Sequence, residues 1–391
     1  MGGGLLQLVA YGAQDVYLTG NPQITFFKVV YRRHTNFALE SIEQTFNGSV
    51  GWGNRVTSTI SRNGDLISRA YLQMSVDAIP NPVPLLGLRA IDYVELEIGG
   101  QKIDKHYGEW MYIWNELSLP ISKKQAYHTM VGGSYTSGDD MFVPLEFWFC
   151  RNIGLALPLI GLQYHEVKVN IQFSGSTNMV TSGSPGTLTA SLWVDYIYLD
   201  TDERRKFAQS SHEYLIEQLQ FTGKESASRK IKLNFNHPVK ELIWTAETDN
   251  TTRGNWVDYT NNSTPIPSDR NYTEFANDLN SVSTHKNLIT SAKLTLNGND
   301  RFAARNGEYF NLIQPFQHHE NVPNNVGINV YSFALKPEEH QPSGTLNMSR
   351  IDTATLDLEY INQNVALVSV YAINYNVLRI LSGMGGIAYS N

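Results

Sequence analysis

The chain of 391 residues is long enough for two hydrophobic cores, which excludes a peptide or a single small module. Its 30 Lys and Arg against 37 Asp and Glu give a net charge of −7, so no net positive field exists to neutralise a nucleic-acid backbone, and we expect no direct genome binding. Charged residues make up only 17% and aromatic residues 11%, a balance that favours strands, turns and buried interfaces over long solvated helices.

The N-terminal residues form no recognisable targeting signal. Met1 is followed by three glycines and two leucines, without the charged residues that begin a secretory leader. Leu6 stands where a myristoylation signal requires Ser or Thr. We interpret residues 1–25 as a flexible arm.

Alternation of apolar and polar residues predicts a series of half-buried strands. Val94, Leu96 and Ile98 alternate with glutamates, and the two glycines that follow predict a turn into another strand. The same alternation recurs at residues 167–173, 231–235, 292–296 and 356–360. Residues 192–199 and 365–381 are apolar on both faces, which is typical of a strand inside a packed sandwich.

Two short helices are predicted. Trp110, Ile113, Trp114 and Leu117 recur at helical spacing, and Pro120 ends the pattern, which predicts an amphipathic helix over residues 106–118. These tryptophans and Trp148 are interpreted as core residues. A second helix is expected over residues 202–209.

A weak internal duplication, together with the number of predicted strands, favours a two-domain architecture. Residues 96–100 lead to a Gly-Glu-Trp at 108–110, and residues 294–298 lead to a Gly-Glu-Tyr at 307–309, so the two halves keep register to within one residue. We therefore predict two similar all-β domains that meet near residues 200–215. The expected boundaries are an arm at 1–25, a first domain at 26–203, a linker at 204–215 and a second domain at 216–391.

Residues 245–285 differ from the rest of the second domain. Asn, Thr, Ser, Asp and Pro replace aliphatic residues there, which predicts a long loop that projects from the domain. Sequons for N-glycosylation occur at Asn47, Asn250, Asn261, Asn262, Asn271 and Asn347. Four of them lie in this loop, where the composition alone produces such matches.

No catalytic or metal-binding motif emerges from the sequence. His165-Glu166 lacks the second histidine of a zinc-protease helix, and His318-His319 would point to opposite faces of an extended chain. We interpret them as loop or strand histidines with ordinary hydrogen bonds. Nucleophile-elbow, Walker and dinucleotide-binding motifs are missing. We expect no enzyme activity, no metal site and no cofactor.

Three further motifs receive structural interpretations. Residues 222–225 resemble a phosphate loop, but Glu225 replaces the Ser or Thr that should follow the lysine. Residues 383–386 are interpreted as a pliable turn after the last strand. Arg32-Arg33 and residues 204–206 are interpreted as parts of interface or linker ion pairs with nearby acidic residues, Glu40 for the first and Asp200, Asp202 and Glu203 for the second.

The cysteine count and the most apolar run of the chain bear on the cellular compartment of the protein. Cys150 is the only cysteine, which excludes an intrachain disulfide and favours a reducing compartment. The most apolar run, residues 154–162, is about half the length that spans a bilayer, and it includes Pro158. We therefore expect no membrane-spanning segment.

Several segments in order along the chain resemble a known family. Residues 7–20, Gln-Leu-Val-Ala-Tyr-Gly-Ala-Gln-Asp-Val-Tyr-Leu-Thr-Gly, and then Asn-Pro-Gln-Ile-Thr-Phe-Phe at 21–27, resemble the start of the major capsid proteins of large icosahedral double-stranded DNA viruses, close to the algal-virus branch. Residues 60–66, 154–160, 193–196, 374–380 and 382–386 resemble other signatures of that family. The match covers nearly the whole chain, apart from residues 245–285.

This resemblance implies a tandem double jelly roll, two eight-stranded β-sandwiches with short helices in the connections. It also implies a homotrimeric capsomer with a pseudo-sixfold outline, which would build the outer shell of the virion. The partners it implies are further copies of the chain, minor capsid proteins and penton proteins, with an internal membrane beneath the shell. Assembly would take place in the host cytoplasm.

The resemblance also implies roles for particular residues. The family's N-terminal arm lies at the capsomer base, so Gly2, Leu5, Leu6 and Leu8 are predicted to act in assembly. Some relatives carry glycans on outward loops, which keeps Asn250, Asn261, Asn262 and Asn271 as candidate sites.

One alternative function remains open from the sequence. A jelly-roll protein that binds carbohydrate or a receptor would use exposed aromatic residues on a loop. Trp256 and Tyr259 are the obvious pair for that purpose. A trimeric solution mass would favour the capsid function over this one.

Overall fold

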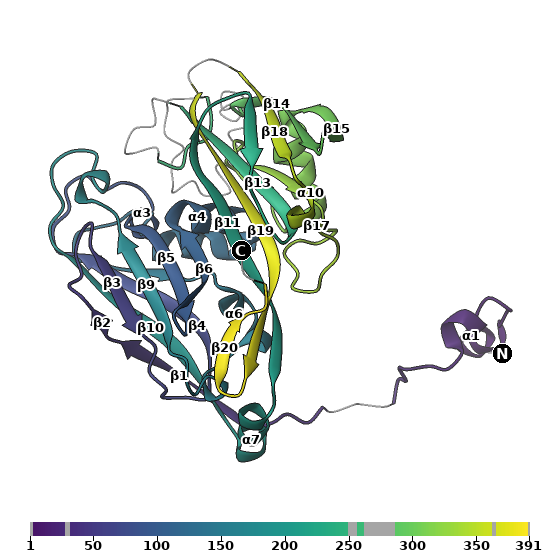
Figure 1. The fold of residues 1–391 in the computed structure, drawn as a ribbon. Coiled ribbons are helices and arrows are strands. Elements are labelled where there is room, and N and C mark those ends of the chain that lie inside the picture. Colours follow the sequence, from purple (N-terminus) through teal and green to yellow (C-terminus); the bar gives the residue numbers. More distant parts are fainter. Residues whose placement is uncertain (1–2, 28–31, 249–255, 262–285, 362–364, 390–391) are drawn as a thin grey trace. The chain divides into compact units, whose positions relative to one another are not determined.

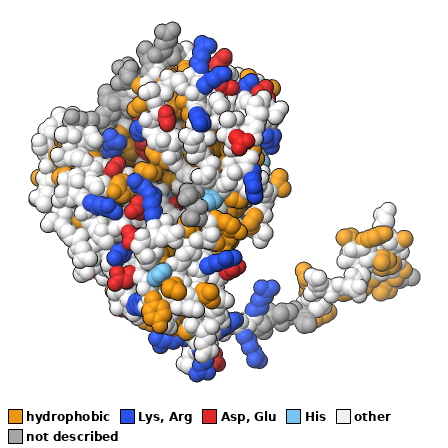
Figure 2. Space-filling model, in the orientation of Figure 1, with side chains coloured by type: hydrophobic (Ala, Val, Ile, Leu, Met, Phe, Trp, Pro, Cys, Tyr) orange, Lys and Arg blue, Asp and Glu red, His pale blue; other side chains and the backbone are white. Residues whose placement is uncertain are grey.

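The computed structural model describes residues 3–27, 32–248, 256–261, 286–361 and 365–389. Residue contacts divide the chain into two units, residues 1–36 and residues 37–391. The first unit contains helices α1 (Gly3–Val9) and α2 (Val16–Thr19). Apart from Asp15, which is half-buried, its described side chains are exposed, and hydrophobic ones gather on it (Figure 2).

Residues 37–199 form the first sandwich. One of its sheets has the order β1 (Phe37–Gln44), β10 (Leu188–Leu199), β4 (Leu66–Val76) and β7 (Asp140–Pro144), with β8 (Leu157–Pro158) beside β4. The other has the order β2 (Phe46–Asn47), β3 (Arg55–Thr59), β9 (Val167–Phe173), β5 (Ile91–Ile98) and β6 (Gln101–Tyr107). The paired strands are antiparallel throughout.

Residues 212–387 form the second sandwich. Its larger sheet has the order β11 (His212–Ser226), β19 (Val365–Leu381), β13 (Pro238–Thr248) and β16 (Asn329–Ser332), with β17 (Leu346–Asn347) and β20 (Met384–Ile387) at the sides. Its smaller sheet has the order β12 (Lys230–Leu233), β18 (Ala354–Tyr360), β14 (Ile289–Leu296) and β15 (Asn299–Asn306). Figure 1 shows the strands of both sandwiches.

The two sandwiches repeat one strand order. The path β1-β10-β4-β7 corresponds to β11-β19-β13-β16, and β3-β9-β5-β6 corresponds to β12-β18-β14-β15. The register agrees as well, because Leu145 N donates a hydrogen bond to Ala70 O directly after β7 in the first sandwich and Phe333 N donates one to Lys240 O directly after β16 in the second. The predicted all-β class is confirmed, and the duplication inferred from residues 96–100 and 294–298 is present in the strand order.

Short helices occupy the connections between strands. They are α3 (Leu86–Arg89), α4 (Gly108–Ser118), α5 (Ile121–Met130), α6 (Trp148–Arg151), α7 (Thr201–Gln209), the π-helical turn η5 (Tyr309–Ile313) and α10 (Gln314–His318). Single 3-10 turns are η1 (Ile153–Leu155), η2 (Leu159–Gly161), η3 (Ser176–Asn178) and η6 (Met348–Arg350). The helices predicted over 106–118 and 202–209 are α4 and α7. The Asp200 side chain caps α7 by accepting a hydrogen bond from Thr201 N.

The core follows the alternation read from the sequence. Val94, Leu96 and Ile98 of β5 have no exposed surface, whereas the glutamates between them are half-buried. One hydrophobic cluster fills the first sandwich and extends to Tyr371 of β19, and a second cluster fills the second sandwich. The two sandwiches therefore share core residues at their junction. Among the described helices, none is long and apolar enough to cross a membrane.

Two sequence-based interpretations are corrected. Residues 383–386 are not only a terminal turn, since Met384–Ile387 forms β20 and pairs with β19. Residues 245–248 continue β13 and so do not begin a loop. Residues 256–261 also do not project, because Trp256 Nε1 donates a hydrogen bond to Pro84 O at 2.8 Å in the first sandwich. The rest of the predicted loop lies outside the described residues.

Candidate assembly surfaces

The aromatic face of α4 connects the two sandwiches. The Trp110 ring centre lies 5.3 Å from that of Tyr371 in β19 and 5.8 Å from that of Trp114. Phe221 of β11 stacks on Tyr371 with ring centres 4.5 Å apart. Trp110 and Trp114 of the first sandwich thus pack on the outer face of the larger sheet of the second, and their prediction as core residues is correct.

Edge strands meet beside this aromatic contact. Gln218 Nε2 of β11 donates a hydrogen bond to Ile103 O of β6, and Leu219 N donates one to Asp104 Oδ1 at 3.0 Å. Asp104 also pairs with His106 Nε2 at 2.9 Å, and both side chains are buried. These bonds satisfy polar groups that the junction removes from water, which would otherwise destabilise it.

A buried cluster of ion pairs adds to the junction. Arg151 of α6 lies 2.9 Å from Glu217 of β11, and Lys240 of β13 lies 2.8 Å from the other oxygen of the same carboxylate. Burial lowers the pKa of Lys240, and the Glu217 charge opposes that shift. Because one carboxylate faces two cations, its removal would take away the nearest anion of buried Lys240 and leave Arg151 with the more distant Glu146, 3.9 Å away.

A second cluster joins α4 to β11 and β13. Lys224 Nζ lies 2.8 Å from Glu109 Oε1 and 2.7 Å from Glu247 Oε1. Burial and the Glu247 charge raise the pKa of Glu109 to about 7. Burial lowers the pKa of Lys224, but the two carboxylates outweigh it and the net shift is upward. Lys224 is therefore a junction residue and not part of a phosphate loop.

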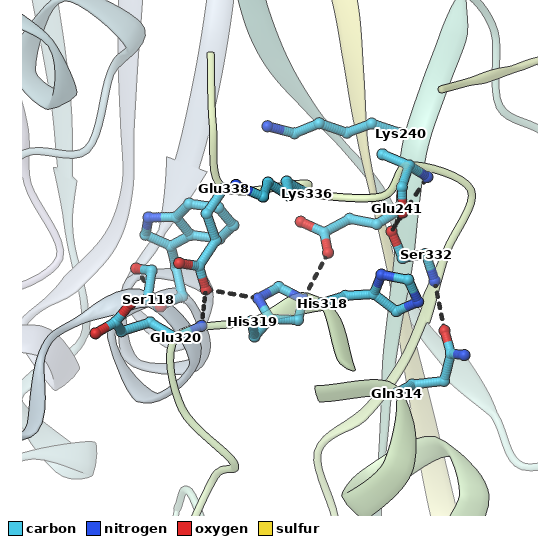
Figure 3. A network of polar contacts seen from close by, with 12 residues as sticks. Ser118, Lys240, Glu241, Gln314, His318, His319, Glu320, Ser332, Lys336 and Glu338 are labelled. Atoms are coloured by element: carbon cyan, nitrogen blue, oxygen red, sulfur yellow. Dashed lines mark hydrogen bonds and ion pairs between the residues drawn. The ribbon is translucent and has the colours of Figure 1, made fainter. Parts of the chain in front are cut away.

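His319 lies in a network of charged groups that the sequence did not reveal (Figure 3). Its Nε2 is 2.9 Å from Glu241 Oε2 and its Nδ1 is 2.8 Å from Glu338 Oε1, and its side chain has no exposed surface. Burial acts to lower the pKa of His319, but the two carboxylates raise it to about 9. The expected extended His-His segment is corrected, because His318 ends α10.

The remaining candidate residues make structural contacts. The described residues include no group of three or more His, Cys, Asp or Glu that could hold a metal ion. His165 Nδ1 lies 2.8 Å from Gly385 O, which is a structural contact. Arg204 pairs with Asp65 at 2.9 Å and not with the acidic residues nearest in sequence. Arg32 and Arg33 are exposed in the first unit.

The aromatic pair of the carbohydrate- or receptor-binding alternative is not available to a ligand. Trp256 is 3% exposed and Tyr259 is 1% exposed. The Arg89 guanidinium also lies over the Trp256 ring, 5.1 Å from its centre. The expectation that these residues form an exposed platform is therefore wrong, since both belong to the core.

Among the glycosylation candidates, the structure describes Asn261. Its residue is exposed, and its Oδ1 accepts a hydrogen bond from Lys286 N at 2.8 Å. Asn250, Asn262 and Asn271 lie outside the described residues. In the arm, the described candidates Leu5, Leu6 and Leu8 are exposed, and Gly2 lies outside the described residues.

Two exposed apolar surfaces on the sandwiches have no counterpart among the sequence predictions. The helix patch consists of Leu312, Ile313, Phe316 and Leu335. The first three belong to η5 and α10. Leu335 comes from a later segment whose carbonyl oxygen at Leu335 contacts His318 Nδ1 of α10. The sheet patch consists of the exposed Phe37 and Leu39 and the half-exposed Tyr71, Phe142 and Trp193 on the outer face of the sheet β1-β10-β4-β7. Exposed apolar clusters of this kind are typical of protein–protein contacts.

Comparison with known proteins gives a consistent result over both sandwiches. Residues 25–200 match the family model described as major capsid protein N-terminus. Residues 203–386 match the family model described as large eukaryotic DNA virus major capsid protein.

Individual relatives match along the full chain. The major capsid protein of Pyramimonas orientalis virus is 55% identical, and that of Paramecium bursaria Chlorella virus 1 is 46% identical, each with 100% of both chains covered. A solved structure of the PBCV-1 virus capsid is 40% identical, with a TM-score of 0.80 over 94% of this chain and 100% of that chain. The Faustovirus major capsid protein, at 13% identity, shares the fold with a TM-score of 0.73 over 95% of this chain and 94% of that one.

Proposed function

Because the chain belongs to the family of large eukaryotic DNA virus major capsid proteins, we propose that its copies associate as homotrimeric capsomers and build the icosahedral outer shell of a large double-stranded DNA virus. The family resemblance noted in the sequence is confirmed, and so is the double-jelly-roll fold. The protein is a structural protein of the virion.

The internal duplication is the observation that carries the proposal of a trimer. Both sandwiches have the same strand order, so three chains offer six similar sides. A threefold assembly with six similar sides fits a hexagonal lattice. Low charge and abundant aromatic residues suit this role, because contacts between subunits and between capsomers remove much of each side from water.

The boundaries of the arm, the linker and the two jelly rolls are also part of the proposal. The arm takes residues 1–25, the first jelly roll 26–203, the linker 204–215 and the second jelly roll 216–391. Helix α7 and the start of β11 fall within the linker region, which supports a connection that is itself ordered.

The proposal also covers the partners of the capsomer and the place where it assembles. Minor capsid and penton proteins would contact the capsomer, an internal membrane would lie beneath the shell, and assembly would occur in the host cytoplasm. The chain would carry out no catalysis and bind no cofactor. Leu5, Leu6 and Leu8, with Gly2, would serve as lattice contacts, which their exposed apolar side chains support.

The proposal also includes glycans on Asn250, Asn261, Asn262 or Asn271. The exposure of Asn261 is compatible with a glycan, and the hydrogen bond from Lys286 N is accepted by its Oδ1, not by the amide nitrogen to which a glycan is attached. Mass spectrometry of virion-derived peptides tests each of the four sites. The unmodified peptide alone would remove a site from the proposal.

The solution mass tests the trimer. Light scattering on the purified full chain should give about three times 44.0 kDa at micromolar concentration. A folded monomer over the same concentration range would contradict the proposed capsomer.

A further inference from the structure

We propose that residues 256–261 form a proton-controlled clasp, which fastens the second sandwich to the first while Glu109 carries a proton and opens when Glu109 ionises. The clasp consists of these described residues. The inference goes beyond the capsomer, because it concerns a contact within one chain and does not depend on the number of copies that associate.

The clasp reaches the first sandwich through Trp256. This residue is 3% exposed, and its Nε1 donates a hydrogen bond to Pro84 O at 2.8 Å. The Arg89 guanidinium of α3 lies over the ring, 5.1 Å from its centre. Pro84 and Arg89 both belong to the first sandwich, so burial of this one indole attaches the clasp to that sandwich.

Few bonds attach the clasp to the second sandwich. Asn325 Nδ2 donates a hydrogen bond to Val257 O, and Asn261 N donates one to Lys286 O at 3.0 Å. The clasp residues lie outside the strands of both sandwiches. A segment that is held in this way opens at a lower free energy than the paired strands beneath it.

Tyr259 places the clasp against a buried group of charges. The residue is 1% exposed, and its hydroxyl has no hydrogen-bond partner among the described residues. Burial raises the pKa of Tyr259 well above its usual value, and the nearby charges of Glu109 and Glu247 add to this shift. Tyr259 therefore lies close to both carboxylates, and its unpaired hydroxyl makes the closed clasp less stable than full hydrogen bonding would.

The two carboxylates share one ammonium beneath the clasp. Glu109 Oε1 and Glu247 Oε1 lie 2.8 Å and 2.7 Å from Lys224 Nζ. The Glu109 side chain is 11% exposed and the Glu247 side chain 8%, so water compensates little of their charge. Ionisation of both carboxylates would place two buried negative charges on a single lysine, which is unfavourable.

The other titratable groups around Glu109 do not remove this conflict. Arg89 lowers the pKa of Glu109, but burial, Glu247 and Lys224 have larger effects on it. Burial and the two carboxylates raise the pKa of Tyr371 of β19, so its phenol supplies no positive charge. Tyr112 of α4 is another phenol close to Tyr259.

The clasp itself adds a negative charge to these groups. Asp258 is its one charged residue, and Asp258 Oδ1 accepts a hydrogen bond from Thr260 N at 2.9 Å. The clasp therefore brings no cation that could compensate an ionised Glu109.

Arg89 connects the charged group to the Trp256 contact. Its guanidinium lies over the Trp256 ring, and its charge acts on Glu109. An ionised Glu109 would compete with the ring for this guanidinium and so weaken the cation–π contact that covers the indole. Ionisation thus acts on the clasp at both Tyr259 and Trp256.

Opening of the clasp changes the proton affinity of Glu109. In the closed state, burial and the Glu247 charge raise the pKa of Glu109 from 4.5 to about 7. When water reaches the carboxyl, its pKa returns toward the lower value. The closed state therefore binds more protons than the open state between these two pH values, and a rise in pH favours opening.

Hydrogen exchange followed by mass spectrometry tests the clasp in the full-length protein. Peptides that contain residues 256–261 report the hydrogen-bonded amides of Thr260 and Asn261. Division by the exchange rate of an unstructured peptide removes the intrinsic effect of pH. We expect the protection factor of these amides to fall at least tenfold from pH 5 to pH 8, whereas that of β5 should change by less than about threefold.

A matched pair of variants assigns the effect to Glu109. Glu109→Gln keeps the shape of the side chain without its titration, so clasp protection should change by less than about threefold between pH 5 and pH 8. Glu166→Gln, at a side chain that is 63% exposed, should retain the tenfold fall. Protection that is independent of pH in the unsubstituted chain, or a fall that persists in Glu109→Gln, would overturn the inference.

Trp256→Ala tests the attachment of the clasp. We expect this variant at pH 5 to show the low clasp protection that the unsubstituted chain shows at pH 8, because its anchor in the first sandwich is removed. Protection of β5 in the same sample verifies that the sandwich remains folded. Full clasp protection in Trp256→Ala at pH 5 would show that the indole does not hold the clasp, and would contradict the proposal.

Discussion

His319 is a buried cation between two carboxylates, and its partners come from distant parts of the chain. Glu241 belongs to β13, and Glu338 lies in the segment after β16. The pKa of His319 is raised to about 9, against about 6.5 in an unfolded chain. The stability that this shift contributes is fully present below pH 6.5 and is lost as the pH rises toward 9.

Removal of this histidine should therefore destabilise the protein in a pH-dependent manner. We expect His319→Gln to lower the free energy of unfolding by about 3 kcal/mol at pH 6, since two carboxylates would lose a buried partner. The loss should be smaller at pH 9.5. Thermal melts at both pH values check this, with His34→Gln in the exposed first unit as control. Equal destabilisation at both pH values would contradict the charged state.

Glu109 titrates with the opposite effect on stability. Its pKa is raised to about 7, so the folded protein holds a proton that the unfolded chain releases near pH 4.5. Between about pH 4.5 and 7 the folded protein binds one proton more than the unfolded chain at this carboxyl, so a rise in pH over this range lowers the free energy of unfolding.

Glu109→Gln should remove this cost and keep Lys224 paired with Glu247. We expect the variant to gain roughly 2 kcal/mol relative to the unsubstituted chain when the pH is raised from 5 to 8. Melting temperatures across that range measure the difference. A variant whose pH profile parallels that of the unsubstituted chain would show that Glu109 is ionised throughout.

At the scale of elements, α4 is the helix that joins the two sandwiches. Trp110 has no exposed surface, and its ring contacts Tyr371 and Trp114. Trp110→Ala should lower the free energy of unfolding by about 3–5 kcal/mol through lost burial and a cavity. The effect should appear in the monomer, as a lower denaturation midpoint.

Trp193→Ala provides the comparison, because Trp193 is half-exposed on the outer face of the sheet β1-β10-β4-β7. It should destabilise the monomer by less than Trp110→Ala does and weaken self-association more. Denaturation and light scattering on both variants measure these two quantities. The reverse order would contradict the distinction between an internal and an intermolecular contact.

Local patterns predicted some elements, and distant contacts decided others. Helix α4 was predictable because its apolar residues recur at helical spacing, and β5 because its glutamates alternate with buried residues. Strand β20 was not predictable, since its two glycines suggest a turn and only pairing with β19 makes them a strand. Trp256 stands in a polar segment, and its burial depends on Pro84 of the first sandwich.

The assembly surfaces were missed for a related reason. The helical spacing of Leu312, Ile313 and Phe316 is short and is interrupted by Pro315, so no amphipathic helix was predicted there. The duplication nevertheless contains a usable signal. When the α4 pattern is shifted by the offset between Gly108 and Gly307, its apolar positions fall on these three residues.

At the scale of the whole molecule, the arm and the sandwiches have different expected roles. Residues 1–36 form a unit of their own, so removal of the arm leaves the contacts of both sandwiches in place. We expect deletion of residues 1–8 to leave trimers intact and to impair shell formation by at least tenfold. Light scattering and electron microscopy of assembly reactions measure the two effects. Loss of the trimer on deletion would assign the arm to the capsomer instead of the lattice.

Our account requires that three chains, each with two similar sandwiches, form an assembly with a pseudo-sixfold outline. Projection images of the purified full-length assembly by cryo-electron microscopy, viewed along its symmetry axis, test this claim most directly. Six lobes of similar size related by threefold symmetry are the expected result. A particle with three lobes, or one without threefold symmetry, would contradict the account.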